Sequence, residues 1–442
     1  MSDTQPDDTV TDRPASAEPT RRTLLQAFAG GTLTAAATGF PGLAAAQGKT
    51  IRIGYISPLT GPQAPFGETD KYTVARIQAL LKDGLTINGQ KYAVEILVRD
   101  NQSNPNKAAE LAGNLILNEK IHLMLPASTT DAINPVSDQC ELHGVPCISS
   151  QAPWQSFVFP RGGSAEKPFK WTYHFFWGLE DVLASFTGMW NSVQTNRKVG
   201  MLFPRNADGE AWGNKEWGLP PAVTKAKFET VIPSSFQPLT NDFSAQISAF
   251  KKAGCDIVGG ISYPVDLKTF ITQCRQQQYR PKIVTVAAAL LFPSGVEAMG
   301  ALGEGMSTEV WWTPAFPFKS SLTGETGAKM AADWEATTKK QWTQPIGYAH
   351  ALWEVALDVL KRAKDPLSRD AIRQAITETN LTTMAGPIRF KDGPTPNICK
   401  TPIVGGQWVK GAKHRYDLRI VDNSASNLVP VEGKLALIGA PA

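Results

Sequence analysis

The chain has 442 residues, of which 42% are hydrophobic and 19% charged, and its formal net charge is +4. This length is too great for one ordinary domain and suits two domains of roughly 150–200 residues. The composition excludes a disordered, collagen-like or multi-span membrane chain, and the small, scattered charge gives no reason to expect nucleic acid as a partner.

The first 46 residues are typical of an export signal. Arg21 and Arg22 precede a segment without charge, rich in Ala, Gly and Thr, that ends near Ala44-Ala45-Ala46. Small residues at such a position suit a signal peptidase, and the paired arginines resemble a twin-arginine signal. We therefore predict that residues 1–46 are removed and that the mature protein works in the periplasm. The alternative is an uncleaved membrane anchor.

From residue 50 onward, short apolar runs alternate with helical patterns. In the first half we expect strands at 51–57, 92–98, 121–125 and 145–149, and helices at 72–80, 105–116 and 130–143. After an aromatic patch at 170–178 the alternation restarts, with helices at 182–193, 213–227, 243–253 and 267–277. Strands are expected there at 199–203, 228–233, 257–261 and 283–286, then an apolar helix at 345–363 and a β-rich tail. Such alternation predicts an α/β fold of two parallel sheets flanked by helices.

Two α/β units on one chain favour a ligand site between them, at the carboxyl ends of the strands. The sequence has no Gly-x-Ser-x-Gly elbow, dinucleotide turn or phosphate loop, which argues against the commonest enzymes of this class. The five Cys and five His are scattered without metal-binding spacing. We therefore expect a binding protein without a catalytic residue, cofactor or metal.

Seven segments, taken in chain order, resemble the branched-chain amino-acid-binding family, which comprises periplasmic solute-binding proteins of ABC transporters. The segments are Gly54–Gly61 with Phe66-Gly67, Val98–Pro105, Pro126–Pro135, Gly144–Ser149, Asp208–Gly213, Asp242–Ser244 and Gly386–Phe390. Their order and spacing cover essentially the whole mature chain.

The resemblance implies the type I periplasmic binding protein fold, with two Rossmann-like lobes joined by three crossovers. By position, lobe one is expected at 50–170 plus 313–395, and lobe two at 171–312 plus 396–442. A small-molecule ligand bound between the lobes would stabilise a hinge-closed form that an ABC permease recognises. We expect a monomer that performs no chemistry on the ligand. A ligand-sensing domain of the same fold is the alternative.

In the family, hydroxyl and backbone N–H groups at the start of the third helix bind the ligand carboxylate. The matching residue here is Thr130, with Ser128 and Thr129 beside it. Free N–H groups and hydroxyls at a helix N-terminus suit an anion, although a helix cap would use the same residues. Backbone contacts are implied at Gln151 and Ala152 after the fourth strand.

One departure from the family concerns the loop after the fourth strand. At the position where the family has a ligand-binding Thr, this chain has Pro153, which offers neither a hydroxyl nor an N–H. The resemblance also implies aromatic walls at Trp212 and Phe66, which could otherwise be core residues, and a hydrogen bond from Tyr263.

The family's counter-ion for a ligand ammonium should follow the strand at 283–286, where the chain reads Ala287-Ala288-Ala289. No Asp or Glu occurs in residues 267–296, and an unpaired buried ammonium costs several kcal/mol. We therefore hypothesise an apolar or aromatic carboxylate, such as a benzoate-like acid, rather than a free amino acid. Branched-chain amino acids remain an alternative. Asp266 could pair with a cationic group of the ligand, which leaves amides and polyamines as further alternatives.

Overall fold

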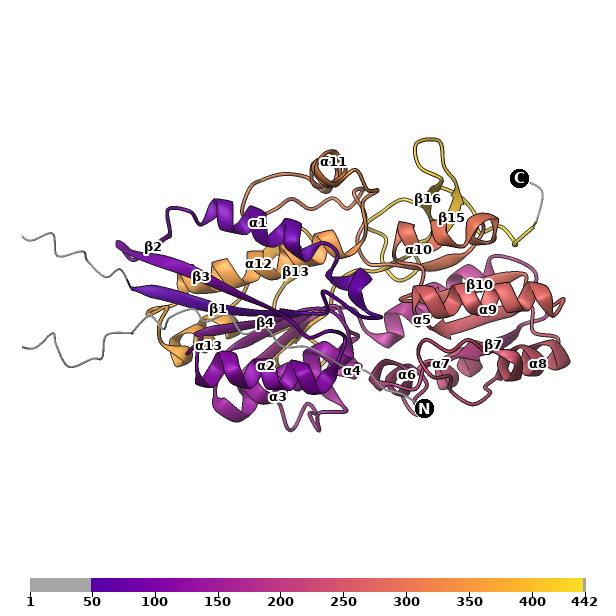
Figure 1. Cartoon of the computed structure of the whole chain (residues 1–442), viewed down its shortest axis with the longest axis horizontal. Coiled ribbons are helices and arrows are strands. Elements are labelled where there is room, and N and C mark those ends of the chain that lie inside the picture. Colours follow the sequence, from indigo (N-terminus) through magenta and orange to yellow (C-terminus); the bar gives the residue numbers. More distant parts are fainter. Residues whose placement is uncertain (1–48, 440–442) are drawn as a thin grey trace, which may run out of the picture. The chain divides into compact units, whose positions relative to one another are not determined.

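The computed structural model describes residues 49–439, so the predicted export signal at 1–46 lies outside the described part of the chain. Two seven-stranded sheets form its framework (Figure 1). The first has the order β14-β6-β5-β4-β1-β3-β2 and is parallel except for the β2–β3 pair. Its strands are Thr50–Ser57 (β1), Leu85–Ile87 (β2), Gln90–Asp100 (β3), Leu123–Pro126 (β4), Cys147–Ser150 (β5), Thr172–Phe175 (β6) and Ile398–Cys399 (β14).

Helices cover both faces of this first sheet. On one face α2 (Pro105–Leu117) and α3 (Thr130–His143) pack against each other and against β1 and β4. On the opposite face lie α1 (Asp70–Leu80) and α12 (Pro345–Arg362), as Figure 1 shows. Because both faces are buried, the strands are near-continuous apolar runs, which is why the sequence pattern identified them. Shorter helices α4 (Trp154–Val158), α11 (Gly327–Thr338) and α13 (Arg369–Thr377) and the hairpin β12 (Leu381–Thr383) and β13 (Gly386–Ile388) complete this half.

The second sheet has the order β16-β15-β11-β10-β9-β7-β8, with antiparallel pairs at β11–β15 and β15–β16. Its strands are Lys198–Leu202 (β7), Glu229–Val231 (β8), Ile257–Ile261 (β9), Ile283–Ala287 (β10), Ser307–Val310 (β11), Val404–Lys410 (β15) and Tyr416–Asp422 (β16). Its helices are Leu179–Asn191 (α5), Ala207–Trp212 (α6), Leu219–Lys225 (α7), Ser244–Ala253 (α8), Pro264–Gln276 (α9) and Pro293–Ala298 (α10). The 3-10 helices are Ala64–Gly67 (η1) and Gly300–Gly303 (η2).

The chain crosses between the sheets after β6, after β11 and after β14, which gives three crossovers. Strands β6 and β14 pair within the first sheet, although the expected limits of lobe one end at residues 170 and 395. The aromatic patch at 170–178 therefore contains a core strand before the crossing begins. The helix expected at 213–227 is confined to the shorter helix α7, because Gly218 and Pro220 start a new helix there, and α6 has already ended at Trp212.

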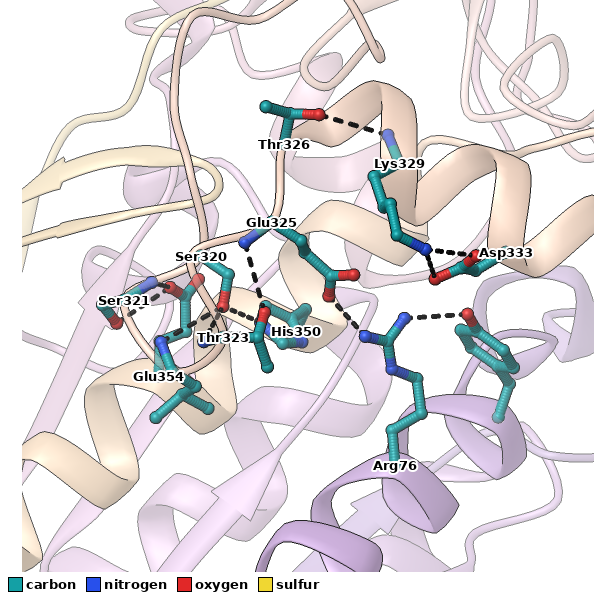
Figure 2. Close-up of polar contacts among 12 residues, drawn as sticks. Arg76, Ser320, Ser321, Thr323, Glu325, Thr326, Lys329, Asp333, His350 and Glu354 are labelled. Carbon is teal, nitrogen blue, oxygen red and sulfur yellow. Dashed lines mark hydrogen bonds and ion pairs between the residues drawn. The ribbon is translucent and has the colours of Figure 1, made fainter.

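Buried polar side chains hold the segment between β11 and α12 against the first sheet's helices (Figure 2). Ser320 Oγ lies 2.8 Å from His350 Nε2, and Ser321 Oγ donates to Glu354 Oε1 over 2.9 Å. Arg76 of α1 forms an ion pair with Glu325. Burial raises the pKa of Glu354 to about 7, so the ionised carboxylate depends on these hydrogen bonds. No helix within residues 49–439 is long and apolar enough to cross a membrane.

The close contact between Gly347 of α12 and the buried indole of Trp312 provides a test of this packing. A Cβ at residue 347 would overlap the Trp312 ring. Gly347→Ala should therefore lower the free energy of unfolding by about 1–3 kcal/mol, as measured by urea unfolding. In the control Gly113→Ala in α2, the nearest atom to a new Cβ is 3.8 Å away, and the helix should gain about 0.5–1 kcal/mol. Equal stability of the two variants would contradict this account.

Candidate ligand-binding site

A cavity lies between the two sheets, at the carboxyl ends of their parallel strands. Its water-accessible volume is only about 30 Å³, well below the roughly 300–1,000 Å³ usual for small-molecule sites. A ligand therefore requires the walls to move apart. The lining residues are Phe66, Thr129, Gln151, Ala152, Pro153, Phe176, Trp177, Asp208, Trp212, Ile261, Ala288, Leu291, Glu309 and Trp311.

Backbone conformations around the cavity are unusual. Ser128, Thr129, Gln151 and Ala288 all have φ between 54° and 76°, in the left-handed region that non-glycine residues seldom adopt. They follow β4, β5 and β10, where the chain turns away from the sheet edge. Strained residues of this kind concentrate at functional sites, because the surrounding fold must hold them there.

Hydrogen bonds cross the cavity between the two halves of the chain. The Thr130 backbone N–H, at the start of α3, donates to Asp208 Oδ1 over 3.3 Å. Tyr263 Oη donates to Asp208 Oδ2 over 2.8 Å. Gln63 joins the two sides, because its amide nitrogen donates to Tyr263 Oη over 3.2 Å and its amide oxygen accepts from Thr129 Oγ1 over 2.8 Å. Asp208 therefore occupies the helix N-terminus at which the sequence placed a ligand carboxylate.

Three carboxyl groups lie at or beside the cavity, and of these Asp208 and Glu309 are buried and Asp131 is half-buried. Desolvation is the main cause of the raised pKa in each. The pKa of Asp131 rises to about 6, with Asp208 as the second cause. Burial also raises the pKa of Asp208. The pKa of Glu309 rises to about 7, although hydrogen bonds from Thr308 Oγ1 and the Ala288 N–H oppose the shift. Among the described residues that line the cavity, none is Lys, Arg or His.

Aromatic rings form much of the cavity wall. The rings of Trp177, in the segment that links β6 to α5, and of Trp212, at the end of α6, have centroids 6.1 Å apart and meet at 85°. Phe176 and Trp311 meet at 73° with centroids 5.2 Å apart. Rings that meet at such angles form an apolar recess that suits the apolar part of a ligand. The faces of the rings also attract cations.

Several polar atoms of the lining have no partner within the described chain. Both polar atoms of the Gln151 amide are buried without a hydrogen bond, and so are the indole N–H groups of Trp177 and Trp311. Behind the lining, Ser128 Oγ is also buried without a hydrogen bond. Unpaired buried polar groups are costly and uncommon, so these atoms are candidates for hydrogen bonds to a ligand.

The structure brings five of the nine sequence-predicted site residues to one cavity. These are Phe66, Thr129, Gln151, Ala152 and Trp212. Ser128, Thr130 and Tyr263 are buried but do not line the cavity, and Ala287 ends β10 while its neighbour Ala288 lines the wall. Their contact with a ligand stays a prediction.

Sequence reasoning missed two acidic residues of the lining. Asp208 was part of a family motif but received no role, and Glu309 lies in the buried strand β11. The counter-ion position implied by the resemblance follows β10, whereas the structure brings two carboxyl groups to the cavity from outside residues 267–296. The signal that could have identified Glu309 is its place directly before the apolar run Val310–Trp312, because charged residues are seldom fully buried without a role.

Comparison with known proteins identifies the class. Residues 50–411 match the family described as periplasmic binding protein, so the chain belongs to this family. The Leu/Ile/Val-binding protein homolog 3 of Brucella melitensis is 26% identical over 61% of this chain and 66% of its own length. The chain thus spans just under two thirds of that relative.

Solved structures share the fold. A leucine-binding protein from Thermotoga maritima is 18% identical, with a TM-score of 0.68 over 84% of this chain and 99% of its own. A solute-binding protein of an ABC transporter from Rhodopseudomonas palustris BisB5, in complex with 3,4-dihydroxybenzoic acid, is also 18% identical. Its TM-score is 0.66 over 84% of this chain and 96% of its own. The predicted type I periplasmic binding protein fold, with two lobes, is confirmed.

The raised pKa of Glu309 predicts a pH-dependent contribution to stability. Between the ordinary value of 4.5 and about 7, the folded protein retains a proton that the unfolded chain releases. The stabilisation is therefore complete below about pH 4.5 and is lost as the pH rises through 7. Relative to wild type, Glu309→Gln should become more stable as the pH rises from 5 to 8, as measured by urea unfolding. The exposed control Glu304→Gln should follow wild type, and a difference independent of pH for Glu309→Gln would contradict the assignment.

Proposed function

We propose that the protein is an extracytoplasmic receptor of an ABC importer, which captures a small organic solute between its lobes and delivers it to a membrane permease. The observation that carries the proposal is the cavity lined from both sheets by aromatic side chains and unpartnered polar atoms. Arg21-Arg22 and the uncharged segment after them support export to the periplasm.

The lobes of this receptor follow the two sheets. We assign residues 50–175 and 313–399 to lobe one, and residues 178–310 and 404–439 to lobe two, because strands β6 and β14 pair in the first sheet. The three crossovers form the hinge. Closure brings Asp208 and Tyr263 of lobe two against Thr130 and Gln63 of lobe one, and the permease recognises this closed form.

The ligand has an apolar or aromatic body, which suits the rings of Phe66, Phe176, Trp177, Trp212 and Trp311. A benzoate-like carboxylate is the first candidate, and the similar Rhodopseudomonas protein is in complex with a dihydroxybenzoic acid. A branched-chain amino acid or amide is the second candidate. It is favoured by Asp208 and Glu309, which supply the carboxyl groups that an ammonium requires.

Thermal unfolding against a ligand panel tests the receptor function. Residues 47–442 are unfolded and refolded to remove carried-over ligand, then mixed with aliphatic amino acids, aromatic acids, dicarboxylates and amides. A ligand at 100 times its dissociation constant should add about 2.7 kcal/mol and raise the melting temperature by a few degrees. If no member of a broad solute panel shifts the transition and a sensor kinase responds to the protein, the sensor alternative replaces transport.

Trp212 provides a mutational test of the cavity. Trp212→Ala removes a ring that the ligand contacts, so the dissociation constant for any ligand found in the panel should rise by about tenfold or more. Trp217→Ala is the matched control, because Trp217 is half-buried and does not line the cavity. Isothermal titration calorimetry measures both variants after circular dichroism has verified their folds. Unchanged affinity in Trp212→Ala would exclude this cavity as the site.

A further inference from the structure

Two of the five cysteines lie in contact with each other. Cys140 is in α3 and Cys147 begins β5, and both side chains are 0% exposed. They belong to one apolar cluster, together with residues of α2, β1 and β4. Burial raises the pKa of the Cys140 thiol, and a hydrogen bond with the Cys147 thiol raises it further. The two sulfur atoms therefore face each other at the junction between α3 and β5.

The turn at this junction fixes the position of one cysteine relative to the other. Helix α3 ends at Gly144, which has a left-handed φ of 63°, and the Val145 N–H donates to the Cys140 carbonyl over 2.9 Å. Ser137 lies one turn before Cys140 on the same face of α3. Its Oγ is 3.7 Å from Cys147 Sγ. The sulfur of Cys147 thus lies against the face of α3 that carries Cys140.

The other three cysteines have no such neighbour within residues 49–439. All five are free thiols in the structure. Cys255 precedes β9 and Cys274 lies in α9, and burial raises the pKa of both without a contribution from another thiol. Cys399 of β14 accepts the Arg389 N–H at Sγ over 3.2 Å. The odd number of cysteines therefore divides into one adjacent pair and three single thiols.

We propose that Cys140 and Cys147 form an intrachain disulfide once the protein reaches the periplasm, a compartment in which such bonds persist. This inference rests on the proposed export and does not depend on the identity of the ligand. The bond closes a ring over residues 140–147 and ties the C-terminal end of α3 to the first residue of β5. Thr129 precedes α3 and Gln151 follows β5, and both line the cavity. The disulfide therefore holds together two segments that meet the ligand.

The reaction is a thiol–disulfide exchange with an oxidant that itself carries a disulfide, a class of protein found in the periplasm. The thiolate of one cysteine attacks the oxidant's disulfide, so that a mixed disulfide forms and one oxidant sulfur leaves. The thiolate of the second cysteine then attacks the mixed disulfide and releases the other oxidant sulfur. The two cysteines lose two protons and two electrons and form an S–S bond of about 2.05 Å. The oxidant is reduced and leaves as a dithiol.

Burial controls the rate of this exchange in both directions. The thiolate is the species that attacks, and both sulfurs are enclosed in the folded protein, where the raised pKa of Cys140 also disfavours its thiolate. Exchange therefore requires the junction between α3 and β5 to open locally, which exposes the sulfurs for a short time. Once the cluster has closed over the bond, the same burial shields it from reductants.

Differential alkylation of the protein isolated from the periplasm tests the pairing. The protein is unfolded in guanidinium with iodoacetamide, then reduced and alkylated with an isotopically distinct reagent, and its peptides are identified by mass spectrometry. Cys255, Cys274 and Cys399 should carry the first label, and Cys140 and Cys147 the second. Protein expressed in the cytoplasm without residues 1–46 is the control and should carry the first label at all five positions.

Two results of this labelling would overturn the disulfide. One is the first label on both Cys140 and Cys147 of the periplasmic protein. The other is a bridge from either residue to a different cysteine or to a second chain. Absence of the protein from the periplasm would instead contradict the proposed export, and a refolding experiment then decides the pairing separately.

Refolding examines the same bond without export. Residues 47–442 are reduced and unfolded, then refolded with oxidised glutathione or with an excess of a phosphine reductant. The oxidised protein should melt a few degrees higher, because the closed ring removes conformations from the unfolded chain. The double variant Cys140→Ala/Cys147→Ala should melt at the same temperature in both buffers, whereas the matched variant Cys255→Ala/Cys274→Ala should keep the difference. Free thiols at both positions after oxidative refolding, or a difference that survives in the first variant, would refute the proposal.

Discussion

The buried carboxylate of Asp208 holds together the arrangement on which the rest of the cavity depends. It accepts hydrogen bonds from the Thr130 N–H of one lobe and from Tyr263 of its own lobe. Because Tyr263 also accepts from Gln63, the positions of the loops after β1, β4, β7 and β9 are coupled. A buried carboxylate without a cation is costly, so the network is stable only while these donors remain in contact. Separation of the lobes therefore requires water to replace them.

The order of strands and helices could be predicted from sequence because parallel strands covered on both faces are continuous apolar runs. Residues 51–57 and 257–261 were identified in this way and form β1 and β9 within a residue of the prediction. The division between lobes was harder to predict, since β6 and β14 are short and their pairing partners are distant in the sequence. The local pattern of apolar residues does not indicate which sheet such a strand joins.

The site was predictable where the resemblance supplied positions, as for Phe66, Thr129, Gln151 and Trp212, which the structure brings to one cavity. The acidic part of the wall was not predictable, because Glu309 reaches it from a strand whose neighbours in the sheet are set by tertiary structure. Phe176, Trp177 and Trp311 belong to aromatic runs, and the pattern of such runs does not distinguish core positions from cavity positions. Convergence of these residues depends on the closed packing of the lobes, which local periodicity does not encode.

The density of indole rings around the cavity has an optical consequence. Three of the chain's 12 Trp residues, Trp177, Trp212 and Trp311, line the space that a solute would fill. Their side chains are at most 2% exposed, so their emission reports a dry environment in the closed form. Opening of the lobes would hydrate these rings and shift that emission to longer wavelength. The protein thus contains its own fluorescent indicator of opening and closing, without an attached dye.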